Sequence, residues 1–261
     1  MGLTVNTNLE AMDAARNLNN TENMLGTAMQ RLSSGLRINS AADDVAGYAI
    51  SERLKGQVSG LNQATQNISD AVSLAQTAQG ALNDVVGMLQ RVRELGVQYA
   101  NGTTSETDKE AIEQETEQLK EEITRVGETT TFNGVKLLEG GEEIKFQVGA
   151  NEKETVAVKT IELKGAVEKA SVTEVKTIDE ALDKVTKAAG EYGAVQNRIQ
   201  YTATNLEVYS QNLSSAVSQI VDVNMASEMT QFTKDQVLQQ AGVAILAQAN
   251  HLPDAVLKLL Q

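Results

Sequence analysis

The sequence predicts a mainly α-helical fold: a long antiparallel helical bundle or coiled coil with a small β-hairpin region. The N- and C-terminal segments are predicted to pair as a terminal coiled coil. Three observations support this fold: two long seven-residue apolar repeats, a single proline (Pro253), and one stretch of alternating apolar residues. Aromatic residues make up only 3% of the chain and Trp is absent, which suits tight helical seams of small side chains.

The first apolar repeat predicts a long helix over residues 61–99. Its two series stand three residues apart, as the a and d positions of a coiled coil do. They are Leu61, Ile68, Ala75, Leu82, Leu89 and Gly96, and Ala64, Ala71, Ala78, Val85, Val92 and Tyr99.

The second repeat predicts a returning helix of similar length. Because a single apolar stripe must be buried against something, two such stripes in one chain are most simply buried on each other. The members are Ile178, Val185, Tyr192, Ile199, Leu206, Leu213 and Ile220, and Ala181, Ala188, Val195, Thr202, Tyr209, Ala216 and Val223.

A shorter helix is predicted between the two long ones, which completes a three-helix bundle. Ser105 or Thr107 can cap its N-terminus, and acidic residues favour its first turn. Its apolar positions are Ile112, Thr116, Leu119, Ile123 and Val126. The polar face of this helix is strongly acidic. We interpret it as a solvated face, and the alternative is a docking surface for a basic partner.

The period changes to two between the middle and returning helices. Phe132-Asn133-Gly134 predicts a turn, and Ile144, Phe146 and Val148 alternate with polar residues before a second alternating run at 155–159. We therefore expect a β-hairpin region at about residues 129–175, placed at the tip of the bundle.

Both ends of the chain carry apolar stripes with few charges. A stripe this narrow cannot form a core alone, so the ends are expected to pair with each other and with neighbouring copies. The residues assigned to polymerisation are Leu18, Leu25, Leu32, Leu238, Ile245, Leu252 and Leu260. Residues 1–43 and 223–261 are thus expected to form a terminal polymerisation domain, and residues 44–222 a helical bundle domain.

No residue pattern supports catalysis. The chain lacks Cys, and its one histidine, His251, has no second histidine to share a metal. We therefore expect no enzyme, no catalytic residue, no metal site and no cofactor. The formal net charge of −13 disfavours nucleic acid and anionic membrane as partners. The N-terminus lacks the basic start and apolar block of a Sec signal peptide, so we expect a cytoplasmic protein or one exported by another route.

Several motifs in the chain resemble bacterial flagellin. They are Arg31–Ala41, with Asp43-Asp44 and Ala46-Gly47 following, and then Leu89–Leu95, Phe132–Leu138, Gly193–Arg198 and Gln240–Asn250. The resemblance covers essentially the whole chain, in a short form without the variable outer domains. It implies a self-assembling subunit of the extracellular flagellum used for motility. The family is exported unfolded by a type III route, which implies an export chaperone and the filament cap as partners.

The resemblance also implies recognition by the host Toll-like receptor that senses flagellin. The matching positions here are Arg91, Leu95 and Glu115. One stretch departs from the family pattern, because Gln219, Val221 and Asn224 stand where two arginines and an acid are usual.

Two other functions compete with the filament subunit. A hook–filament junction protein would resemble flagellin at both ends, and a secreted helical binding module would use a β-tipped bundle to engage a partner. Long polymers in the electron microscope would favour the filament subunit, whereas a binding module would stay monomeric.

Overall fold

The computed structural model describes residues 7–141, 143–168 and 170–259. The chain divides into two compact units. Met1–Lys55 and Leu213–Gln261 form one, called here the terminal unit, and Gly56–Asn212 form the other, called the bundle unit. The division falls inside two long helices, whereas the domain boundaries expected from the sequence, 43/44 and 222/223, coincide with breaks between helices.

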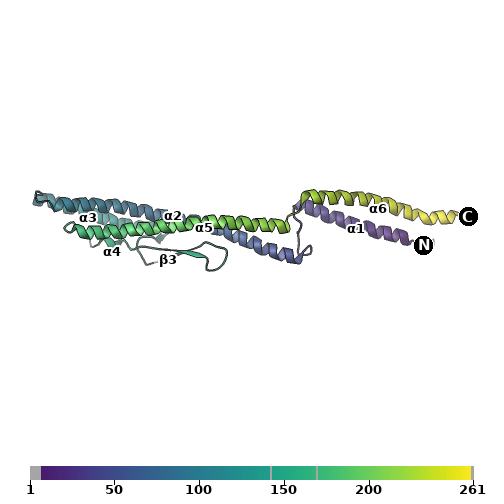
Figure 1. Cartoon of the computed structure of the whole chain (residues 1–261), viewed down its shortest axis with the longest axis horizontal. Helices are drawn as coiled ribbons and strands as arrows, with labels where there is room; N and C mark the ends of the chain where they lie inside the picture. Colours follow the sequence, from purple (N-terminus) through teal and green to yellow (C-terminus); the bar gives the residue numbers. More distant parts are fainter. Residues whose placement is uncertain (1–6, 142, 169, 260–261) are drawn as a thin grey trace. The chain divides into compact units, whose positions relative to one another are not determined.

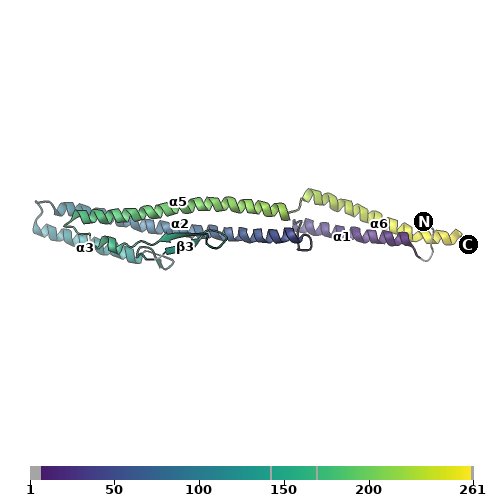
Figure 2. The same cartoon turned by 60° about the horizontal axis from the view of Figure 1, so that its bottom comes forward.

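Helices α2 (Val45–Tyr99) and α5 (Val175–Val221) are the two long helices of the bundle unit, and they run antiparallel (Figures 1 and 2). The predicted repeat of α2 is confirmed, because each member from Leu61 to Val92 is buried. In α5 the members from Ile178 to Tyr192 are buried in the same core cluster as α2. Tyr209 is an exception: it is 46% exposed, and Ser210 takes the half-buried position beside it.

Helix α3 (Glu106–Thr129) adds the third helix of the bundle, as predicted. Ser105 is its N-cap and forms a reciprocal capping box with Asp108. Ile112, Thr116 and Ile123 are buried against the other helices, and the acidic residues face outward.

The β region comprises two small antiparallel hairpins. Strands β1 (Thr131–Phe132) and β2 (Val135–Lys136) are joined by Asn133 and Gly134, whose φ angles of 48° and 80° suit this tight turn. Strands β3 (Glu143–Gln147) and β4 (Thr155–Lys159) form the second hairpin. A short helix, α4 (Lys164–Val167), follows and was not predicted.

The second hairpin lies along the side of the long helices, so its expected place at the tip of the bundle is wrong (Figures 1 and 2). The Asn67 side chain of α2 donates to the Gln147 carbonyl at 2.9 Å. Val148 and Val156 pack on Ile68 of α2 and Ile199 of α5. The apolar face of a two-stranded sheet needs such a partner to be stable.

The terminal unit pairs α1 (Leu9–Ser34) with α6 (Met225–Leu259), side by side in both views (Figures 1 and 2). Gly35 ends α1 in the left-handed conformation, at φ 74°. The following segment hydrogen-bonds to the end of α5, where the Arg37 amide donates to the Val221 carbonyl at 2.6 Å. In the part of the chain that the structure describes, no helix is long and apolar enough to cross a membrane.

Candidate assembly interface

The predicted apolar series of α1 faces α6. Leu18, Leu25 and Leu32 are each half-buried, and Thr21 and Ala28 between them are buried. This arrangement is the a/d seam of a coiled coil formed by two segments of one chain. The structure therefore brings the three N-terminal leucines together along one helix–helix contact.

Helix α6 has an inner face that packs on α1 and an exposed outer face, and Leu238 and Ile245 of the predicted polymerisation residues lie on the outer face. The least exposed positions of α6 form the inner face and follow one another in steps of four and three residues. They are Glu228, Phe232, Asp235, Gln239, Gly242, Leu246 and Ala249. Leu238 and Ile245 lie off this seam and are 45% and 60% exposed. The side chain of Leu252 and the whole of Leu260 lie outside the described residues.

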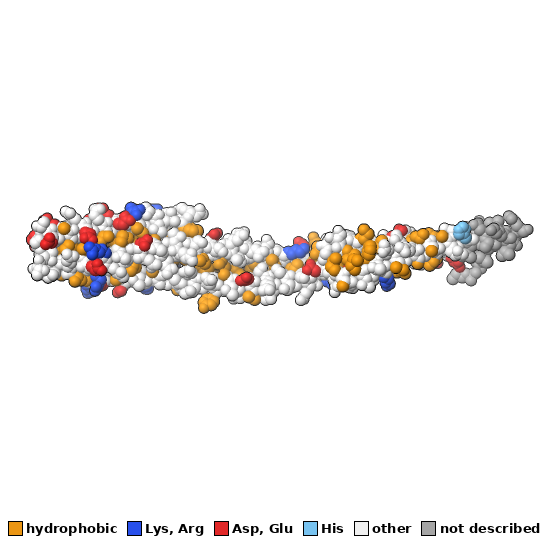
Figure 3. All heavy atoms as spheres, turned by 90° about the horizontal axis from the view of Figure 1, so that it is seen from above, with side chains coloured by type: hydrophobic (Ala, Val, Ile, Leu, Met, Phe, Trp, Pro, Cys, Tyr) orange, Lys and Arg blue, Asp and Glu red, His pale blue; other side chains and the backbone are white. Residues whose placement is uncertain are grey.

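The terminal unit exposes many large apolar side chains, some of which Figure 3 shows in orange on its right half. The set from α1 and α6 is Leu9, Met12, Met24, Met29, Met225, Met229, Val237, Leu238, Val243 and Ile245. Soluble monomers rarely expose a large apolar surface without using it for an interaction. The methionines add adaptable side chains of the kind common on binding surfaces.

A polar notch interrupts the seam near the start of α6; we define it by Arg31, Glu228, Gln231 and Asp235. The cavity there measures about 320 Å³. Asp235 is only 1% exposed and accepts hydrogen bonds from the Gln231 amide at 2.9 and 3.1 Å. Arg31 lies 3.8 Å from Glu228, and its buried Nε atom has no hydrogen-bond partner among the described residues.

Sequence reasoning missed this notch because its residues are charged or polar at core positions. The step pattern of four and three along α6 could have shown it. A search for regularly spaced apolar residues could not have shown it, because Glu228 and Asp235 are charged and interrupt the apolar stripe.

A second candidate surface lies on the bundle unit, where Arg91 of α2 and Glu115 of α3 form an ion pair at 2.9 Å. Both side chains are about half exposed, and Glu94 lies 3.3 Å from Arg91. The Glu115 hydrogen bond and charge, with Glu94, raise the pKa of Arg91. The structure thus brings two of the three predicted receptor residues together.

Leu95, the third predicted receptor residue, is 2% exposed and packs with Ile112 and Val172. A side chain this buried cannot contribute a contact area to a partner without local rearrangement. In this structure Leu95 packs in the core of the bundle unit with Ile112 and Val172, and its contact with a receptor stays a prediction.

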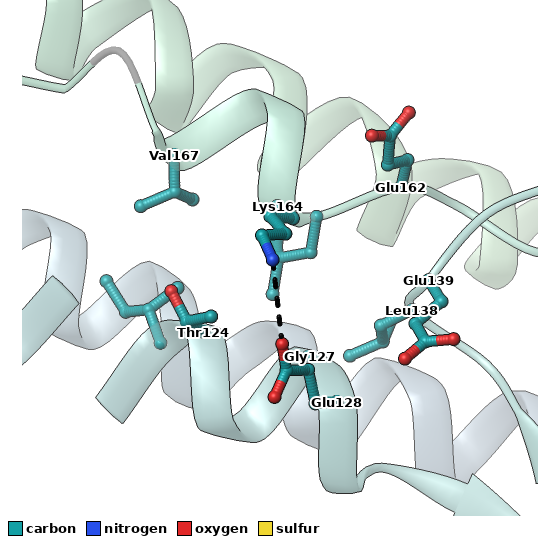
Figure 4. Close-up of a pocket in the computed structure, with 10 residues that line it drawn as sticks. Thr124, Gly127, Glu128, Leu138, Glu139, Glu162, Lys164 and Val167 are labelled. Atoms are coloured by element: carbon teal, nitrogen blue, oxygen red, sulfur yellow. Dashed lines mark ion pairs between the residues drawn. The ribbon is translucent and has the colours of Figure 1, made fainter. Parts of the chain in front are cut away.

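The bundle unit also contains a cavity of about 270 Å³ between α3, α4 and the segment after β2 (Figure 4). Its buried apolar lining residues are Ile123, Leu138, Leu163 and Val167. Lys164 of α4 and Glu128 of α3 form an ion pair beside it at 3.8 Å. Across the described residues, no group of His, Cys, Asp and Glu could hold a metal ion. The cavity combines an apolar lining with charged side chains at its rim.

Comparison with known proteins identifies the family. The N-terminal helical region of bacterial flagellin matches residues 5–143, and its C-terminal helical region matches residues 175–260. A flagellin of Halalkalibacterium halodurans is 45% identical, with 99% of this chain and 100% of the relative covered. The "Flagellar filament 33 kDa core protein" of Treponema phagedenis is 39% identical at the same coverage.

Solved structures agree with these relatives. The crystal structure of Bacillus cereus flagellin has a TM-score of 0.51 and 29% identity, covering 58% of this chain and 94% of that one. A putative flagellar hook-associated protein from Vibrio parahaemolyticus has a TM-score of 0.58, covering 69% of this chain and 100% of that one. Its identity of 15% indicates a shared fold alone. The chain therefore belongs to the bacterial flagellin family, whose members are structural subunits of the extracellular flagellar filament and not enzymes.

Proposed function

We propose that this flagellin polymerises for motility through the paired helices α1 and α6 of the terminal unit. The observation that carries the proposal is the exposed apolar surface of this pair, which includes Leu238 and Ile245. Leu18, Leu25 and Leu32 contribute to polymerisation by holding α1 on α6, which keeps the exposed surface of the pair in place. Burial of apolar surface between copies supplies the free energy of assembly.

Two variants test this proposal. Leu238→Glu with Ile245→Glu places charges on the outer face and is expected to abolish seeded polymerisation in electron micrographs. Val97→Glu is the matched control, because Val97 is 56% exposed on the bundle unit.

Removal of the chain from Val237 onward, which includes the predicted Leu252 and Leu260, should leave the bundle folded and also abolish polymers. Filaments from either the double variant or the truncated chain would contradict the proposal.

The exposed face of α6 is also an argument that an export chaperone binds this subunit before assembly. An apolar helix face in an exported subunit needs cover, and an export chaperone can provide it. The filament cap is the partner that the family resemblance implies at the growing end. The double variant Leu238→Glu with Ile245→Glu should lose co-purification with the chaperone, and retained binding would place the chaperone elsewhere.

A host Toll-like receptor is a second proposed partner, supported by the exposed Arg91–Glu115 pair. Arg91 offers a planar guanidinium, which suits bidentate recognition and interface burial. Arg91→Ala is expected to reduce the potency of the monomer in a receptor reporter-cell assay. Arg125→Ala is the control, because Arg125 forms an exposed ion pair on α3 with Glu122. Unchanged potency of Arg91→Ala would remove this role.

The two competing functions have weaker support. A hook–filament junction protein is favoured only by the likeness in fold to the hook-associated protein. A monomeric binding module does not account for the apolar surface on both helices of the terminal unit.

A further inference from the structure

We propose that the exposed methionines of α1 and α6 are an oxidation site, at which peroxide converts their thioethers into sulfoxides and thereby blocks polymerisation. The proposal rests on the proposed function, since it needs copies that associate through the terminal unit. It adds a reversible chemical modification to an association driven by apolar surface.

The methionines of this chain are concentrated on the terminal unit. The sequence contains seven, and Met1 lies outside the described residues. Of the remaining six, Met88 of α2 is half-buried against the core of the bundle unit. The other five belong to α1 or α6 and are 47–61% exposed: Met12, Met24, Met29, Met225 and Met229. Peroxide can therefore reach the sulfur atoms of the terminal unit more readily than that of Met88.

Met24 lies beside the flank of α6 that carries the proposed assembly surface. It lines the polar notch together with Gln231. Gln231, Leu238 and Ile245 stand seven residues apart and so share one flank of α6. A neighbouring copy that covers Leu238 and Ile245 would therefore also cover the thioether of Met24.

Met29 and Met229 lie on the other flank of the helix pair. Each directly follows a residue of the seam between α1 and α6, whereas Met24 directly precedes one. The two helices run antiparallel (Figures 1 and 2). In an antiparallel pair, the positions that directly follow the seam on each helix share one flank. Methionine sulfur is thus exposed on both sides of the contact between α1 and α6.

The chemical step is a two-electron oxidation of each thioether. A lone pair of the Sδ atom attacks one oxygen of hydrogen peroxide, and the O–O bond breaks. The second oxygen leaves with both hydrogens as water, so the sulfur is oxidised to the sulfoxide and the peroxide is reduced. The chain has no Cys and no Trp to compete for the oxidant.

The sulfoxide opposes assembly more than folding. On an exposed side chain of the free subunit, the new S=O oxygen stays hydrated and leaves the α1–α6 pair intact. Between two copies, the same oxygen would be buried among apolar side chains without a hydrogen-bond donor, which costs free energy. Because reductases convert the sulfoxide back to the thioether, the block is reversible.

Peroxide treatment of the monomer tests the site. Peptide mass spectrometry is expected to find sulfoxide at the five terminal-unit methionines before Met88. The critical concentration for seeded polymerisation should then rise on the order of tenfold, while the thermal midpoint of the oxidised monomer should equal that of the native chain. The two methionine sulfoxide reductases, supplied with a dithiol, should restore the native critical concentration. An unchanged critical concentration after complete oxidation of the five would overturn the proposal.

Substitution by leucine identifies the sulfur atoms responsible, because Leu and Met have similar volumes. A variant with all five terminal-unit methionines replaced should polymerise like the native chain and should continue to do so after peroxide treatment. It carries Met12→Leu, Met24→Leu, Met29→Leu, Met225→Leu and Met229→Leu. Met88→Leu is the matched control and should remain as sensitive to peroxide as the native chain. Equal sensitivity of the five-site variant and the native chain would also overturn the proposal.

Filaments of the native chain provide a test that needs no variant. Met24, Met29 and Met229 should be oxidised more slowly in filaments than in monomers, because neighbouring copies cover them. Equal rates in the two states would overturn the proposal. If oxidised subunits polymerise normally while Leu238→Glu with Ile245→Glu does not, the proposed function stands and only the oxidation site falls. Filaments from that double variant would overturn the proposed function itself.

Discussion

Leu18 of α1 packs directly on Gly242 of α6. A Cβ atom added at Gly242 would lie 3.3 Å from Leu18 Cδ1. Because Gly242 has no side chain, the two helices can approach closely here, and Leu18 fills the space beside the glycine. The contact shows that the N-terminal leucines are used within the chain, and that the opposite faces of α6 remain for neighbours.

Gly242→Val should weaken the α1–α6 pair. Two extra methyl groups and a Cβ must displace Leu18, and overpacking of this kind costs about 1–3 kcal/mol. Faster amide exchange at residues 14–25 would report the loss. Gly26→Val is the control in the same pair, since a Cβ at Gly26 meets nothing within 4 Å. Equal exchange in the two variants would show that the close approach has no energetic role.

Tyr192 should make the bundle unit sensitive to strong alkali. Its hydroxyl donates to the Leu137 carbonyl at 3.2 Å, and burial raises the pKa of Tyr192 to about 12. Because the folded pKa lies above the unfolded value of about 10, the unfolded chain ionises first as the pH rises. Stability is therefore full below pH 10 and falls between about pH 10 and 12, by on the order of 2 kcal/mol.

Tyr192→Phe separates this effect from the hydrogen bond. At pH 7 the variant should lose about 1 kcal/mol, because the buried Leu137 carbonyl loses its donor. Between pH 10 and 12 its urea midpoint should fall less steeply than that of the native chain. Identical slopes in the two proteins would mean that other groups cause the alkaline loss.

The capping box of α3 should matter most above acidic pH. Ser105 donates to Asp108, and this hydrogen bond lowers the pKa of Asp108 below its ordinary 3.8. A lowered folded pKa gives stability that is present above about pH 4 and is lost as the pH falls through the folded value. Ser105→Ala should lower the thermal midpoint at pH 7, and the difference from the native chain should shrink at low pH.

Thr107→Ala is the matched control for this helix end. Thr107 was the alternative cap from the sequence, but the structure gives the capping role to Ser105. The control should melt like the native chain at every pH. A larger effect from Thr107 than from Ser105 would contradict the observed cap.

The heptads predicted the long helices well because their members are apolar and contact a partner over many turns. The repeat fails where the helix drifts relative to a strict seven-residue spacing. At Tyr209 the half-buried position has moved to Ser210, as expected when 3.6 residues per turn replace 3.5.

The outer part of the assembly surface was harder to predict. An apolar residue on α6 can face α1 or a neighbouring copy, and the sequence alone does not distinguish Leu246 from Ile245. Burial does, because Leu246 is half-buried and Ile245 is 60% exposed. The notch was missed for the opposite reason, since Asp235 occupies a core position that an apolar pattern excludes.

The departure from the family pattern near the end of α5 leads to the last prediction. Val221, at a position where an arginine is usual, is 2% exposed, and its carbonyl accepts the Arg37 amide at 2.6 Å. The Arg37 side chain also donates to the Ile220 carbonyl at 2.6 Å. The segment after α1 is thus already tied to α5 by Arg37, with an apolar side chain beneath the contact.

Val221→Arg should destabilise the terminal unit by roughly 2–4 kcal/mol, because it buries a charge without a partner and crowds Arg37. Gln219→Arg is the matched control. It restores the other usual arginine at an exposed position and should change stability by less than about 0.5 kcal/mol. Urea unfolding followed by circular dichroism measures both. Equal stability of Val221→Arg and the native chain would contradict this prediction. It would mean that the fold accommodates an arginine at position 221 and that burial of the Val221 side chain adds nothing to stability.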